Sequence, residues 1–261
     1  MANGLIRGLI AKGTSPENIW ASDLDESKLK LLSQDCGICT GNNSDIASNA
    51  NVIVLAVKPQ VMRDVCKALA ADLDRRGALL VSIAAGITTA HLESWFGESA
   101  AIVRCMPNTP ALVGMGASGL FANARVTEEQ KLLAQGIIST VGFATWVDAD
   151  SDIDIVTAVS GSGPAYFFLF MEAMQATAKE MGLSEDLARA LTYHTAAGAA
   201  ALAQYSEDDI ATLRRNVTSP GGTTEQAILQ FEDGDLRGLV AKALKAARTR
   251  SVELAEETDS T

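Results

Sequence analysis

The run Val52-Ile53-Val54-Leu55-Ala56-Val57, followed by Lys58-Pro59, decides the class of fold. Continuous β-branched and aliphatic residues of this length are typical of a strand that is buried on both faces. Such strands occur in parallel sheets whose two faces are covered by helices. Proline ends the strand, the next residues have helical spacing, and a second buried run follows at residues 78–83. A strand, a helix and another buried strand predict a parallel α/β sheet.

The same alternation continues on both sides of this run and covers residues 1–150. Strands are expected at residues 19–22, 52–57, 78–83, 101–105, 116–121 and 143–147, and helices at residues 1–12, 26–35, 60–71 and from Thr127. The pattern predicts a doubly wound, Rossmann-like parallel sheet, the fold in which dinucleotides bind beyond the carboxyl ends of the strands.

Residues 151–261 lack strand patterns and predict an all-α domain. Residues 167–181 place phenylalanine and methionine side chains on one helical face, and Gly182 ends that helix. Ser184 is the expected N-cap of the next helix, and Thr223 with Gln226 is the expected capping box of a later one. Wide apolar faces with many small residues suit close packing against a second chain, so we expect a dimerisation domain.

Composition excludes several classes of function. The chain carries 21 Lys plus Arg and 32 Asp plus Glu, a net charge of -11. Such a surface repels phosphodiester backbones and anionic lipids, so we expect no nucleic-acid and no membrane partner. Every apolar run is far shorter than the roughly 20 residues that cross a bilayer. The first residues do not have the pattern of a secretory signal, so we expect a cytoplasmic protein.

Cysteine and histidine predict neither a metal site nor histidine chemistry. Cys36 and Cys39 have C-x-x-C spacing, but they follow a helix instead of preceding one, so we expect reduced structural thiols. A zinc site would need a second pair of ligands, and Cys66 and Cys105 are isolated in the sequence. His194 falls on an apolar helical stripe and is expected in the core or at an interface.

The beginning of the chain departs from a complete dinucleotide-binding domain. Such a domain begins with a strand, a glycine-rich turn and a helix that faces the pyrophosphate. Residues 1–12 correspond to that helix, and no G-x-G-x-x-G precedes them. Without the strand and turn, we expect weak dinucleotide binding; the upstream codons would show whether the natural protein carries them. Asp23 lies where a ribose-binding acid belongs, although acids at such positions often only cap a helix.

Five loops along the chain are candidates for a binding or catalytic site. Three lie at expected strand ends, at residues 56–59, 83–86 and 104–110. The helical half contains S-G-S-G-P-A-Y at residues 160–166 and S-P-G-G-T-T at residues 219–224. Each loop alone is explained as a turn. Together, over residues 1–253, they resemble the pyrroline-5-carboxylate reductase family.

This resemblance implies that the cyclic imine 1-pyrroline-5-carboxylate is reduced to L-proline, the last step of proline biosynthesis. Hydride addition to a protonated imine gives the amine directly, which agrees with the scarcity of histidine. The implied cofactor is NADPH, with NADH left open because Asp23 favours a free ribose 2′-hydroxyl. The implied partners are the small-molecule substrate and a second copy of the chain, with larger rings of dimers left open. In that dimer, residues 219–224 of one chain close over the nicotinamide held by the other.

The resemblance also assigns roles to individual residues. Thr224 is the implied catalytic residue, in contact with the ring nitrogen. The implied substrate-binding residues are Ser219, Pro220, Gly221, Gly222, Thr223, Thr224, Glu207, Ser160, Gly161 and Gly163. The implied cofactor-binding residues are Met1, Ser22, Asp23, Asn43, Ala56, Val57, Lys58, Pro59, Ala84, Ala85, Asn108 and Asn216.

Two other interpretations remain open from the sequence. The first is another imine or 2-hydroxy acid reductase of the same plan. Such enzymes typically use a lysine of the helical half as the acid, and residues 151–178 contain none. The second is a non-catalytic dimeric module that lost its cofactor turn.

Overall fold

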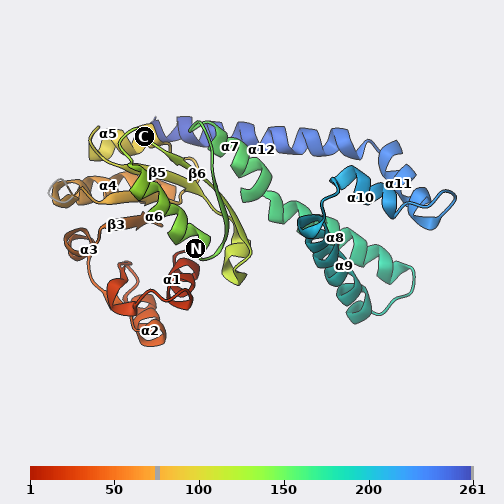
Figure 1. The fold of residues 1–261 in the computed structure, drawn as a ribbon, viewed down its shortest axis with the longest axis horizontal. Coiled ribbons are helices and arrows are strands. Elements are labelled where there is room, and N and C mark those ends of the chain that lie inside the picture. The colour runs from red at the N-terminus through yellow and green to blue at the C-terminus, as the bar shows by residue number, and fades with distance from the viewer. Residues whose placement is uncertain (74–76, 260–261) are drawn as a thin grey trace. The chain divides into compact units, whose positions relative to one another are not determined.

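The computed structural model describes residues 1–73 and 77–259. The chain forms two compact units (Figure 1). Unit 1 contains Met1–Ser162 and Ala246–Thr261, and unit 2 contains Gly163–Lys245. The expected domain boundary between residues 150 and 151 stays a prediction, since the units divide after Ser162 and unit 1 also takes in the end of the chain.

Unit 1 is built on a five-stranded sheet with the order β3-β4-β5-β6-β7. Its strands are β3 (Val52–Leu55), β4 (Leu79–Ser82), β5 (Ile102–Met106), β6 (Gly116–Ala122) and β7 (Gly142–Trp146). A separate parallel pair is formed by β1 (Trp20–Ala21) and β2 (Cys39–Thr40). The expected α/β class and all expected strands are confirmed.

One pairing corrects the expectation of a wholly parallel sheet, because β6 runs antiparallel to β5. The connection between them holds only the short 3₁₀ helix Thr109–Val113. A parallel neighbour would need a crossover of about a dozen residues or more, usually with its own helix. The short connection therefore turns the chain back beside the strand it has just left.

Helices cover both faces of the sheet, as the apolar strands predicted. Leu79 and Val81 of β4 join the core cluster that contains residues of α1 and α6, whereas Leu80 joins the cluster of α4 and α5. The helices of unit 1 are α1 (Ala2–Ala11), α2 (Glu26–Cys36), α3 (Asn43–Asn49), α4 (Pro59–Leu73), α5 (Thr89–Phe96), α6 (Glu128–Ser139) and α7 (Asp152–Val156). A π-helical turn, Thr157–Gly161, continues α7. Helix α3 was not expected, although its capping box of Asn42 and Asp45 is a readable signal.

Unit 2 is helical, and no described residue after Trp146 forms a strand. Its helices are α8 (Gly163–Glu180), α9 (Glu185–Tyr205), α10 (Ile210–Asn216), α11 (Thr223–Asp233) and the first part of α12 (Leu236–Asp259). Ser184 caps α9 as expected, its hydroxyl accepting the N–H of Leu187.

The expected capping box of Thr223 and Gln226 is wrong. Gly222 is the N-cap of α11 and Thr223 is its first helical residue. The reason is the preceding turn, in which the N–H of Gly222 donates to the carbonyl of Ser219 at 3.0 Å. This turn leaves Gly222 in the extended conformation of an N-cap, so Thr223 lies one position too far into the helix to cap it.

Apolar side chains remain exposed on the helices of unit 2. Phe167 and Leu169 of α8 are each 67% exposed in the single chain. The continuous helical stretch Asp152–Glu180 is long and apolar enough, by length and composition, to cross a membrane. The lengths of the uninterrupted apolar runs did not predict such a stretch, because polar residues divide the runs in the sequence but do not end the helix. A surface of this kind is typical of an interface between protein chains.

Candidate functional site

The carboxyl edge of strands β3, β4 and β5 brings three predicted loops together. The strands are parallel neighbours, and Leu55 pairs with Ser82, which pairs with Arg104. The loops that follow therefore leave the sheet side by side. Ala84 and Asn108 are buried there, whereas Ala56 and Lys58 are exposed. Buried and exposed residues of the three loops thus alternate at this edge of the sheet.

Asn108 joins the β5 loop to the turn that begins the S-G-S-G-P motif. Its side-chain amide donates to the carbonyl of Ser160 at 2.9 Å, and its side-chain oxygen accepts the N–H of Ala117 at 2.9 Å. Gly161 lies close by, since a Cβ there would come within 2.5 Å of Met106 Cε. The structure thus places Ser160 and Gly161 beside the β5 loop. The side chain of Asn108 is engaged within the protein, so we expect it to shape the cofactor site more than to contact the cofactor directly.

The predicted adenosine end lies on the smaller parallel pair. Ser22 and Asp23 follow β1, and Asn43 begins α3 after β2. Asp23 is exposed, and its carboxylate accepts the N–H of Asp25 at 2.9 Å. Asp25, and not Asp23, caps α2, and the backbone N–H of Lys28 is the main cause that lowers the pKa of that carboxyl. Asp23 is therefore not the helix cap that an acid at a strand end often is. Met1, the remaining predicted residue of this side, is the N-cap of α1.

The S-P-G-G-T-T loop of unit 2 leads into the N-terminus of α11. Gly221 has φ +73°, the left-handed conformation that favours glycine, and its N–H donates to the Glu225 carboxylate at 2.8 Å. Thr223 and Thr224 occupy the first turn and are exposed. The first N–H groups of a helix have no partner within the helix and attract anions. The first turn of α11 could therefore bind an anion, and the role of Thr224 toward the substrate stays a prediction.

The other predicted residues of unit 2 lie on the neighbouring helices. Gly163 begins α8, Glu207 lies just before α10, and Asn216 is the last residue of α10. The side chain of Asn216 donates to Asp208 at 3.4 Å, and both residues are exposed. Their roles toward cofactor and substrate stay predictions.

The titratable side chains outside these loops do not form a metal centre among residues 1–73 and 77–259. All four cysteines are free. Burial raises the pKa of Cys66 and of Cys105 to about 12, so both remain protonated thiols near neutral pH. His194 is exposed in the single chain, so the expectation of a core position is wrong, and the interface alternative stays a prediction.

One G-x-G-x-x-G spacing does occur, at Gly114–Gly119. It does not form a phosphate loop, because it runs into strand β6 instead of opening a helix. Gly119 is explained by packing, since a Cβ there would lie 2.6 Å from Val156 Cγ2.

Comparisons with known proteins agree with this arrangement. A family model described as pyrroline-5-carboxylate reductase dimerisation matches residues 150–254, and one described as NADP oxidoreductase, coenzyme F420-dependent, matches residues 1–86. The pyrroline-5-carboxylate reductase of Pseudomonas aeruginosa is 50% identical over 258 residues, covering 98% of this chain and 94% of the relative. That of Vibrio alginolyticus is 45% identical, covering 97% and 94%.

Solved structures show the same similarity. A pyrroline-5-carboxylate reductase from Coxiella burnetii has a TM-score of 0.94 and 46% identity, with 97% of this chain and 94% of that chain covered. Pyrroline carboxylate reductase from Plasmodium falciparum, solved with NADP bound, has a TM-score of 0.85 and 29% identity, with 97% and 93% covered.

Proposed function

The chain belongs to the pyrroline-5-carboxylate reductase family, and we propose that it reduces the imine of 1-pyrroline-5-carboxylate to L-proline with hydride from NAD(P)H. The observation that carries the proposal is the 50% identity to a reductase of this name over 98% of the chain. Protein expressed from the complete gene should convert pyrroline carboxylate to proline as NAD(P)H is consumed. A failure to form proline with either cofactor, in a folded dimer, would instead support the non-catalytic module. Reduction of a 2-hydroxy acid precursor in preference to the imine would support the other reductase.

The residues present fit the ribose and the nicotinamide end of a dinucleotide. Asp23 is exposed at the end of β1, where it can accept from ribose hydroxyls, and the small side chains of Ala56, Ala84 and Ala85 leave the carboxyl edge accessible. When bound, the nicotinamide supplies the hydride. Its addition would form the new C–H bond at the imine carbon and move the C=N electron pair onto the protonated nitrogen, which gives the amine.

The protein's part is mainly to bind and orient the substrate. The N-terminus of α11 holds the carboxylate through N–H groups of its first turn. The Thr224 hydroxyl hydrogen-bonds the ring nitrogen and fixes which face of the imine is presented. No side chain has to protonate an oxygen during the transfer, so a histidine is not required.

Replacing Thr224 by valine keeps the shape of the side chain and removes its hydroxyl. Losing one hydrogen bond to the reacting nitrogen should cost about 1–3 kcal/mol of transition-state binding, so kcat/KM should fall about five- to 150-fold. NADPH affinity should stay unchanged, because the hydroxyl is assigned to the substrate. Steady-state kinetics and cofactor titration measure both quantities.

Thr223→Val is the matched control, since Thr223 occupies the preceding position in the same exposed turn. It should change kcat/KM by less than twofold. Equal effects of the two substitutions would remove Thr224 from the mechanism.

We propose NADPH as the preferred cofactor, with NADH as the alternative. A substitution at Asp23 tests how this residue affects the preference. Its carboxylate repels a ribose 2′-phosphate, with an energy of about 1 kcal/mol or more at contact distance. Asp23→Ser should therefore raise the ratio of NADPH to NADH catalytic efficiency about tenfold. Kinetics with both cofactors measure the ratio. Glu26→Gln, which removes a charge from the first turn of α2, is the control and should leave the ratio unchanged; an equal rise there would indicate a general charge effect.

The assembly forms part of the same proposal. The dimerisation match over residues 150–254 and the exposed apolar face of α8 support a homodimer. We place the protein in the cytoplasm, with residues 219–224 of one chain closing over the nicotinamide of the other. Light scattering would distinguish a single dimer from a ring of dimers.

A further inference from the structure

Two stretches of chain connect unit 1 to unit 2. The first crossing, after Ser162, continues from α7 and its π-helical turn. The second, before Ala246, lies within α12, which runs unbroken from Leu236 to Asp259. Both crossings therefore continue from helices that are held within unit 1, namely α7 with its π-helical turn and the end of α12.

A single buried carboxylate holds both of these helices. Oδ1 of Asp154, on α7, accepts from Arg104 Nη2 at 3.2 Å and from Ser251 Oγ at 2.8 Å. Arg104 lies in β5 and is 1% exposed, and Ser251 lies in α12 and is 3% exposed. One oxygen atom thus joins the central strand, α7 and α12.

The other end of the guanidinium is held by Asp150. Arg104 Nη1 donates to Asp150 Oδ2 at 2.7 Å, and Asp150 Oδ1 accepts the N–H and the hydroxyl of Thr89 at the start of α5. Within the described part of the chain, Arg104 Nε has no hydrogen-bond partner. A buried ion pair with an unsatisfied donor is weak evidence for a gain in stability. The cluster is better explained by the geometry that it imposes.

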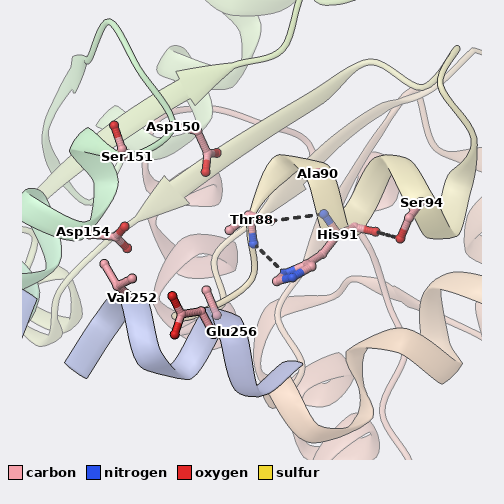
Figure 2. A pocket seen from close by; sticks show the side chains of 10 residues that line it. Thr88, Ala90, His91, Ser94, Asp150, Ser151, Asp154, Val252 and Glu256 are labelled. Carbon is pink, nitrogen blue, oxygen red and sulfur yellow. Dashed lines mark hydrogen bonds between the residues drawn. The ribbon is translucent and has the colours of Figure 1, made fainter. Parts of the chain in front are cut away.

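An open cavity lies beside these helices. Figure 2 shows a cavity bordered by Asp150 and Asp154 on one side, Val252 and Glu256 of α12 on another, and the first turn of α5 on a third. Its volume is about 380 Å³. The Asp154 carboxylate, which accepts from Ser251, borders this cavity.

The same strand leads directly to the reaction edge. Arg104 precedes Met106 and Asn108, and Asn108 holds the carbonyl of Ser160. The helix formed by α7 and its π-helical turn is therefore attached to β5 and its loop at both ends, through Asp154 and through Ser160. We propose that Asp154, with Ser251 as its partner on α12, is a positioning residue for the reduction, since it ties α7 and the end of α12 to β5, the strand whose loop brings Asn108 to Ser160 at the reaction edge. This inference rests on the proposed function.

The test compares Ser251→Thr with Ser251→Val, two side chains of nearly equal shape of which only threonine keeps the hydroxyl. Ser251→Val should lower kcat for pyrroline carboxylate at least fivefold, while the dissociation constant of NAD(P)H stays within twofold and the protein remains dimeric. Ser251→Thr should retain at least half of the kcat. Arg250→Ala is the control on α12, because it removes an exposed pairing with Glu253 and Glu257 without touching Asp154.

Two results would overturn the proposal: equal kcat values for the threonine and valine variants, or an equal loss in Arg250→Ala. If the valine variant does not fold, Ser251→Ala replaces it in the same comparison. Amide hydrogen exchange over residues 246–259 gives a second readout, and it should be faster in the valine than in the threonine variant. If the protein without any substitution has no reductase activity, that result counts against the proposed function alone. The hydrogen-exchange measurement on the Ser251 variants still tests whether Ser251 holds α12.

Discussion

Arg104→Met is expected to lower the free energy of unfolding by about 3–5 kcal/mol, the range for removing one partner of a buried ion cluster. The side chain of Arg104 is 1% exposed and pairs with Asp150 at 2.7 Å and with Asp154 at 3.2 Å. Methionine fills much of the same volume, so the loss comes mainly from two carboxylates left without a counter-charge. Urea unfolding, with the slope of the transition checked for change, measures it.

Arg7→Met is the matched control for this measurement. Arg7 pairs with Asp35 at 3.0 Å, but both side chains are more than half exposed. An exposed pair contributes about 0–1 kcal/mol, so this substitution should have little effect. Adding Asp150→Asn and Asp154→Asn to Arg104→Met should recover part of the loss, because the buried charges are then gone. Equal losses in the Arg7 and Arg104 variants would show that leaving Asp150 and Asp154 without the counter-charge does not destabilise the fold.

Ala199→Glu is expected to abolish both the dimer and the reductase activity, with a loss of at least about hundredfold. Ala199 is exposed in the single chain on α9, in an alanine-rich stretch that we assign to the interface. Burying a carboxylate among apolar side chains without a partner costs several kcal/mol, so the chains should separate. If residues 219–224 complete the site of the other chain, the monomer cannot catalyse the reaction. Light scattering and kinetics at one protein concentration measure both effects.

The same substitution at Ala124, an exposed loop position of unit 1, is the control and should leave the dimer and activity intact. Mixing a Thr224→Val chain with a Lys58→Glu chain tests the sharing of the site, since each mixed dimer keeps one undamaged combination. Activity should then exceed that of either variant alone. An active monomer at assay concentration would contradict the prediction.

Local patterns predicted the strands and helices of unit 1 well, because a strand that is buried on both faces of a sheet is recognisable as one continuous run of apolar residues. Residues 52–57 and 78–83 are apolar at nearly every position, and β3 and β4 lie within them. The predictions were wrong where the conformation of an element depends on the turn that precedes it. The direction of β6 depends on the length of the turn before it, and the start of α11 depends on the turn at Ser219–Gly222 rather than on the threonine that follows.

The sequence by itself determined the α/β class, the helical second half and the order of the functional loops, because these follow from periodicity and from motifs of adjacent residues. Only the tertiary structure decided which polar side chains meet. Asp154 contacts Arg104 and Ser251 from 50 and 97 residues away, and Asn108 reaches Ser160 across 52 residues. Periodicity reports the environment of each position, but it carries no information about which distant group satisfies a buried charge. That choice is made when the sheet and its covering helices pack together.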